Sequence, residues 1–315
     1  MRVQLLVVLT VFAFVAGFPA SRGFASPAPQ TKRSKSDADI NKIGHRNITR
    51  GPNFYSPEKE KELGKVLSQE VERTSKLLDN LVMAEYIGRV VQNVAKNSDT
   101  RFPITVRVID SDEVNAFTLP AGYLYVTRGL LFRLENEAEL ASVLARGIAH
   151  TALRTYTQEA TKGELMQLST NAALLSSDPR IGGIPLAIPL ATLATQREAE
   201  IDADYFGVQY MYKTGYDPKC FTDFVQRIWV SGSASGEKIP KVFGKYPPVD
   251  ERLASLRKEI SEVLPPRSGA ISSTPEFDAF KLRLPAQKAK PERLELRKPT
   301  ETTEPQAPSL IPKPE

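Results

Sequence analysis

The sequence predicts an α+β fold that is mainly helical and contains a small β-sheet. Apolar residues recur at helical spacing through most of the chain, whereas short alternating runs rich in β-branched residues occur only at 104–127. Hydrophobic residues make up 41% and charged residues 25% of the 315 residues, as in ordinary globular proteins. This composition rules out a wholly disordered chain, a collagen and a polytopic membrane protein. A net charge of only +5 gives no indication of nucleic-acid binding.

The N-terminal residues 1–25 are predicted to be a signal peptide. Arg2 precedes an apolar stretch, residues 3–18, which is shorter than the roughly 20 residues that span a bilayer, and small residues follow it. An uncleaved anchor is the alternative. We therefore expect an exported protein, in the periplasm or outside the cell. Residues 26–52 are rich in Pro, Ser, Lys and Arg and are predicted to be a linker.

The main domain is expected at 53–265, and its helices carry start signals or an apolar period. Ser56, Pro57 and Glu58 give a cap residue, a proline at the first helical position and an acid in the first turn, so a helix begins there. Apolar residues at helical spacing predict the other helices. Those helices are expected over 83–96, 136–153, around 162–176, around 196–214 and over 249–263.

The predicted strands lie between the second and third of these helices. Residues 104–109 alternate and are β-branched, which is typical of a strand. Two short strands, 116–119 and 123–127, flank the turn at Pro120-Ala121-Gly122. The proline-rich residues 266–315, with their alternating charges, are predicted to be a largely disordered tail.

Four separated stretches of the sequence suggest a family. These are residues 113–131, 137–145, 200–218 and a closing segment with Pro247, Pro248 and Arg252. In this order they resemble the zinc metallopeptidases of family M48, of the HtpX, CAAX prenyl protease and BepA type. The resemblance implies a zincin domain whose active-site helix carries His-Glu-x-x-His, with a glutamate from a later helix as the third zinc ligand.

The motif that this family uses for catalysis is degenerate here. Arg146 stands where the first histidine is expected, and Gly147 stands where the general base is expected. Only His150 and Glu200 remain as metal ligands, and Tyr246 replaces a histidine of the closing segment. One imidazole and one carboxylate fall short of the three or four donors of a zinc site. The sequence therefore predicts a pseudopeptidase without a cofactor.

Several roles near this motif stay open at the level of sequence. Arg146 either pairs with Glu200, in the place of a metal, or points to solvent. His150 is either a vestigial ligand or a hydrogen-bonded core histidine. Asp204 either bonds to His150 or caps local backbone.

Two functions of different classes remain. The first is a non-catalytic factor of the cell envelope that binds extended or unfolded polypeptide, for quality control or assembly. By the resemblance, Asn115, Ala116 and Phe117 would offer it an exposed strand edge; the alternative is an ordinary edge strand. The second is an active zinc metalloendopeptidase with an atypical ligand set. Peripheral membrane association is a further alternative. It would use the apolar stretch 181–193, which Gly and Pro residues interrupt.

Overall fold

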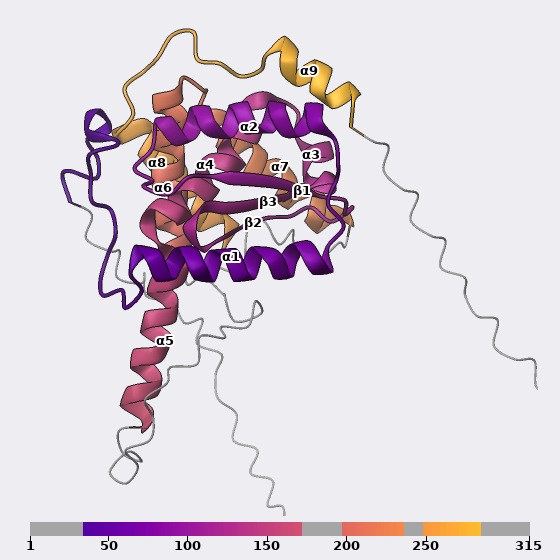
Figure 1. Ribbon diagram of the computed structural model, residues 1–315. Helices are drawn as coiled ribbons and strands as arrows, with labels where there is room; N and C mark the ends of the chain where they lie inside the picture. The colour runs from indigo at the N-terminus through magenta and orange to yellow at the C-terminus, as the bar shows by residue number, and fades with distance from the viewer. Residues whose placement is uncertain (1–33, 172–196, 236–247, 285–315) are drawn as a thin grey trace, which may run out of the picture. The chain divides into compact units, whose positions relative to one another are not determined.

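The computed structural model describes residues 34–171, 197–235 and 248–284 (Figure 1). The predicted signal peptide, the apolar stretch 181–193 and Tyr246 lie outside these residues. Within the described residues, helices dominate and surround one small sheet, so the α+β expectation is confirmed. The helices are η1 (Ile40–Lys42), α1 (Pro57–Thr74), α2 (Leu81–Lys96), η2 (Pro120–Gly122), α3 (Arg128–Arg133), α4 (Glu137–Leu153), α5 (Thr155–Asn171), α6 (Arg197–Thr214), α7 (Lys219–Ser235), α8 (Val249–Glu262) and α9 (Pro275–Leu282).

The sheet has three strands in the order β1-β3-β2. They are β1 (Thr105–Ile109), β2 (Ala116–Leu119) and β3 (Tyr123–Thr127), as the alternation predicts. The β1–β3 pair is parallel and the β2–β3 pair is antiparallel, with Phe117 opposite Tyr125. The turn between β2 and β3 uses positive φ angles at Ala121 (60°) and Gly122 (91°). This topology leaves β2 at an edge of the sheet.

The centre of the domain is α4. Every residue of this helix except Arg146 is buried, because the sheet, α2 and α6 pack around it (Figure 1). The Asn136 side chain caps the helix by accepting from the Glu139 amide at 2.9 Å. A Cβ atom added at Gly207 of α6 would lie 3.1 Å from the Cα of Arg146, so this glycine permits a close approach of α6 to α4.

Helix positions largely follow the predictions, with one shift and three additions. The Ser56 cap and Pro57 begin α1 as expected. The helix predicted around 162–176 begins earlier, at Thr155, because Arg154 adopts a left-handed conformation (φ 56°) and ends α4 there. Helices α3, α7 and α9 were not predicted from the sequence.

The predicted linker at 26–52 is wrong over its described part. Residues 40–42 form η1, and Arg46 is buried, with both Nε and Nη2 donating to Asp99 at 3.0 and 2.6 Å. A single buried ion pair gives no apolar period, which explains why the sequence analysis missed it.

The predicted tail at 266–315 is likewise wrong for residues 266–284. Helix α9 lies beside α2, and its Phe280 ring stacks on Tyr86 with centroids 4.7 Å apart. Hydroxyl groups of Tyr86, Tyr216 and Thr274 all donate to the buried carboxylate of Glu137, the first residue of α4. The ordered domain thus extends past residue 265 on the strength of a few aromatic and hydroxyl contacts.

Over the described residues, no helix combines the length and the apolar character that crossing a membrane requires.

Candidate functional site

Four polar side chains of two adjacent helices meet at the degenerate motif. Arg146 and His150 lie four residues apart on α4, and Glu200 and Asp204 lie four residues apart on α6. This spacing places each pair on one helix face. Because α4 and α6 approach closely at Gly207, the two faces come together inside the domain.

The Arg146 side chain turns toward α6 rather than toward solvent. Its guanidinium forms an ion pair with the carboxylate of Glu200, and its Nε donates to Asp204 Oδ1 at 3.1 Å. Only 11% of the Arg146 side chain and 5% of the Glu200 side chain are exposed. Arg146 therefore pairs with Glu200 and does not point to solvent, which were the two alternatives for this side chain.

A second arginine completes the cluster. The fully buried Arg252 of α8 binds the Asp204 carboxylate with both ends of its guanidinium, through Nε at 2.6 Å and Nη2 at 2.7 Å. Asp204 therefore binds two guanidinium groups, which differs from both alternatives expected for it, a bond to His150 and a cap of local backbone. The two arginines and the two carboxylates balance in charge, as groups removed from water must.

Burial sets the protonation of the cluster. Desolvation, followed by the neighbouring Arg252, lowers the pKa of Arg146 to about 10, so the group stays charged at neutral pH. Burial also holds the pKa of His150 well below its usual value, and Arg146 and Arg252 lower it further. The imidazole is thus neutral. Its Nδ1 lies 3.3 Å from Thr155 Oγ1, and its Nε2 lies 3.9 Å from Glu200 Oε1.

The position of the missing general base is closed by packing. A Cβ atom at Gly147 would lie 2.4 Å from Leu124 Cδ1 and 2.8 Å from Thr118 Oγ1. These distances are shorter than van der Waals contacts, so neighbours must move before any side chain fits there. The ends of the Leu124 and Thr118 side chains, from β3 and β2, thus occupy the place of a side chain's first carbon at position 147.

The outer edge of β2 faces away from the rest of the sheet. The Thr127 amide donates to the Asn115 carbonyl at 3.0 Å, and hydrogen-bonded pairs alternate along an antiparallel ladder. The backbone groups of Ala116 and Thr118 therefore point away from β3. The hydroxyl of Tyr156 lies at this edge and accepts a hydrogen bond from the Thr118 backbone. Burial raises the pKa of this hydroxyl, and both Arg146 and the bond from Thr118 oppose the rise. Tyr156 thus covers part of this edge.

These residues do not fit a zinc ion. Within residues 34–171, 197–235 and 248–284, no group of three or more His, Cys, Asp or Glu side chains is placed to hold a metal. His150 and Glu200 supply one imidazole and one carboxylate, and the Arg146 guanidinium, a cation without a lone pair, lies against that carboxylate. A divalent ion in this position would meet a positive charge and too few donors.

Three members of the site were not predicted from the sequence. Thr118 and Leu124 close the Gly147 position, and Tyr156 lies 6.0 Å from the His150 ring and covers the strand edge. Nothing in their spacing marks them, because their roles depend on how the sheet and α5 lie against α4. Arg252 was expected only as part of a closing segment; its contact with Asp204 depends on the packing of α8 against α6.

Comparison with known proteins agrees with this architecture. The sequence model of Peptidase family M48 matches residues 82–260, more than half of the chain. The chain is 24% identical to the beta-barrel assembly-enhancing protease of Yersinia pestis over 222 residues. This aligned region covers 67% of this chain and 46% of that protein. The protein of the same name from Escherichia coli (strain K12) is 24% identical over 242 residues, 71% of this chain and 48% of that protein.

A eukaryotic relative is also similar. The mitochondrial metalloendopeptidase OMA1 of Arabidopsis thaliana is 28% identical over 166 residues, 49% of this chain and 33% of that protein. The matched part of this chain spans slightly less than half of each bacterial relative and about a third of the plant one.

Proposed function

The chain belongs to peptidase family M48, and from that premise we propose that it is a non-catalytic member, without zinc, that binds extended or unfolded polypeptide in the cell envelope. The proposal rests on the charge that occupies the metal position, the packing at the general-base position, and the outer edge of β2, which is unpaired at Ala116 among the described residues.

The observation that carries the proposal is the ion pair between Arg146 and Glu200. In the family, a metal would be the counter-ion of this glutamate; here a guanidinium from α4 has that role. The carboxylate is therefore compensated without a metal, and the guanidinium repels a divalent ion. Hydrolysis in this family needs both a metal and a base, and the loss of a general base alone costs about 10²- to 10⁴-fold in rate.

Polypeptide binding is supported by β2, which needs no metal for it. The outward backbone groups of Ala116 can pair with an extended segment, as added strands do at sheet edges, while Tyr156 covers the N–H of Thr118. Two relatives are named as proteases that enhance β-barrel assembly, which supports polypeptide as the partner class. The predicted signal peptide at 1–25 supports an envelope location.

The direct test is metal content, measured on the purified full-length protein after incubation with zinc and removal of excess ion. We expect less than about a tenth of an equivalent of zinc, and no chelator-sensitive cleavage of casein. The matched variant is Arg146→His, which adds a third donor beside His150 and Glu200. We expect that variant to bind about one equivalent of zinc while still failing to cleave casein, because position 147 lacks a base. Stoichiometric zinc and chelator-sensitive cleavage by the unaltered chain would overturn the proposal.

The edge can be tested separately from the metal. Ala116→Pro removes an outward N–H but leaves the ladder to β3 intact, since prolines are tolerated on edge strands. We expect several-fold weaker binding of a permanently unfolded polypeptide, such as reduced and carboxymethylated lactalbumin, with an unchanged melting temperature. Equal binding by the variant would show that this edge is not the contact.

A surviving metalloendopeptidase is the second candidate, because the relatives are named as proteases. It would require a further metal ligand from outside the described residues. The same zinc and casein measurements separate the two candidates.

A further inference from the structure

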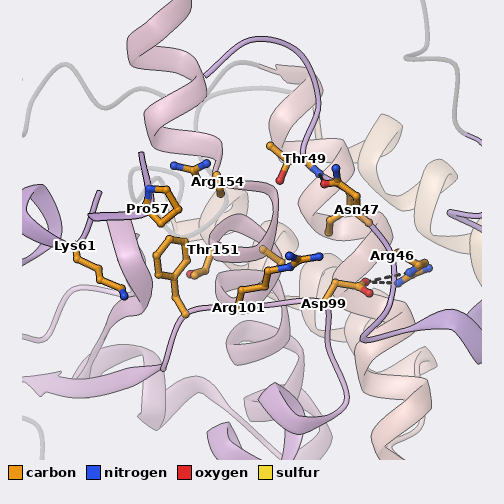
Figure 2. A pocket seen from close by; sticks show the side chains of 12 residues that line it. Arg46, Asn47, Thr49, Pro57, Lys61, Asp99, Arg101, Thr151 and Arg154 are labelled. Atoms are coloured by element: carbon orange, nitrogen blue, oxygen red, sulfur yellow. Dashed lines mark hydrogen bonds and ion pairs between the residues drawn. The ribbon is translucent and has the colours of Figure 1, made fainter. Parts of the chain in front are cut away.

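A hollow of the domain lies at the C-terminal end of α4, beyond the degenerate motif (Figure 2). It has a volume of about 360 Å³, within the range of small-molecule sites. Four segments line it: residues 46–49 ahead of α1, the first turns of α1, residues 99–102 after α2, and the end of α4 from Thr151 to Arg154.

The charge of the lining is strongly unbalanced. Arg46, Lys61, Arg101 and Arg154 line the cavity, against a single carboxylate, that of Asp99. Figure 2 shows these side chains around the hollow, with Arg46 and Asp99 joined to each other.

Two of the four cations are already neutralised. Arg46 forms a buried ion pair with Asp99 at 2.6 Å, and Arg154 pairs with Glu60 of α1 at 2.6 Å. The exposed side chains of Lys61 and Arg101 have no ion pair within 4 Å among the described residues. Two positive charges of the lining are therefore without an ion-pair partner among the described residues.

The floor of the cavity is held in place before any ligand arrives. Besides its pair with Asp99, Arg46 donates through Nη1 to the Asp37 carbonyl at 2.6 Å and to Gln209 Oε1 at 2.7 Å. Asp99 also accepts from the Gly44 amide at 2.7 Å and from the Tyr210 hydroxyl at 2.9 Å. A network with this many fixed partners loses little conformational entropy on binding, which favours affinity.

Strained backbone marks the wall formed by α4. Arg154 is left-handed (φ 56°), a conformation that disfavours residues other than glycine. The side chain holds this geometry by donating to Glu60 Oε2 and to the Tyr55 carbonyl, both at 2.6 Å. Strain that the surroundings maintain in this way is often found at binding sites.

The remaining lining is apolar or uncharged. Buried Ile48 and Phe102 form an apolar surface, and Asn47, Thr49 and Thr151 supply neutral hydrogen-bonding groups. We propose that this cavity binds a small organic anion, whose phosphate or carboxylate group contacts Lys61 and Arg101 and whose apolar part lies against Ile48 and Phe102. The proposal is independent of whether the domain is catalytic.

The test is a titration of the full-length protein with phenyl phosphate at low salt, followed by calorimetry or by ¹H–¹⁵N NMR shifts of residues 46–49 and 99–102. We expect saturable one-to-one binding that Arg101→Gln and Lys61→Gln each weaken about three- to ten-fold, as loss of a hydrogen bond to a charged group does. Lys65→Gln is the matched control: this exposed lysine lies one turn further along α1 and does not line the cavity.

Two comparison ligands separate the parts of the proposal. Phenol keeps the ring but has no negative charge at neutral pH, and inorganic phosphate keeps the charge but lacks the ring; both are expected to bind several-fold more weakly than phenyl phosphate. Absence of saturable binding, equal affinity for phenol, or equal weakening by Lys65→Gln and Arg101→Gln would overturn the proposal. Circular dichroism melting curves show whether each variant is folded, so that a loss of binding is not mistaken for a loss of structure.

Discussion

Replacing Arg146 by methionine tests directly whether the guanidinium stabilises the fold as a substitute for a metal. The variant keeps an unbranched side chain of similar length but removes the guanidinium that pairs with Glu200, whose side chain is 5% exposed. Asp204 is less affected because Arg252 still binds it with two hydrogen bonds. Removing one partner of a buried pair typically costs about 3–5 kcal/mol of unfolding free energy. For a domain of this size the melting temperature would fall by roughly 10 °C.

The assay is urea unfolding at pH 7, followed by far-ultraviolet circular dichroism. Arg73→Met is the matched control, because Arg73 pairs with Glu70 on the exposed face of α1, and we expect no measurable loss there. Adding Glu200→Gln to Arg146→Met should restore most of the lost stability, since no uncompensated charge is then buried. The reasoning is refuted if Arg146→Met unfolds within about 1 kcal/mol of the unaltered protein, or if the second substitution gives no recovery.

Three further predictions follow from the same cluster. Burial holds the pKa of His150 below the pKa of the same group in the unfolded chain, so as the pH falls the unfolded state takes up a proton first. The contribution of neutral His150 to stability is therefore present above about pH 6.5 and is lost below it. Urea unfolding should show a loss of about 1.4 kcal/mol between pH 7.5 and 5.5 from this group, and His150→Gln should remove that part of the slope; an unchanged slope would contradict the assignment. Gly147→Ala should destabilise the domain by about 1 kcal/mol, because crowding outweighs the gain in helix propensity. Gly88→Ala on α2, with open space around it, should stabilise the domain by a similar amount in the same urea assay. A gain in stability at both positions would refute the crowding at Gly147. Tyr156→Phe should free the Thr118 N–H and tighten binding of an unfolded polypeptide several-fold, as measured by fluorescence anisotropy, and weaker binding would show that the hydroxyl assists the contact instead.

Local signals made much of the fold predictable. The bounds of β2 and β3 follow from their alternation on either side of Pro120-Ala121-Gly122, and the Ser56 cap defines the start of α1. Features that depend on one unusual residue or on distant contacts were not predictable. An arginine such as Arg154 rarely adopts a left-handed conformation, so the start of α5 at Thr155 was missed.

The candidate site was predictable only as far as helix periodicity reaches. Spacing of four residues puts Arg146 with His150, and Glu200 with Asp204, on single faces, and the family resemblance brings the two faces together. Spacing does not specify how a third helix lies against them, which is why the bidentate contact of Arg252 with Asp204 did not follow from the sequence. The crowding around Gly147 was hidden for the same reason, since Leu124 reaches it from a strand.

The hydroxyl groups that converge on Glu137 have a practical consequence for any recombinant fragment. A fragment cut at residue 265 would keep every element that the family match covers, yet it would lose Thr274 and the two phenylalanine rings of α9. The carboxylate of Glu137, in the first turn of α4, would then have one hydrogen-bond donor fewer, and the ring of Tyr86 would be exposed to solvent. Fragments intended for crystals or for binding measurements should therefore continue at least to Leu284.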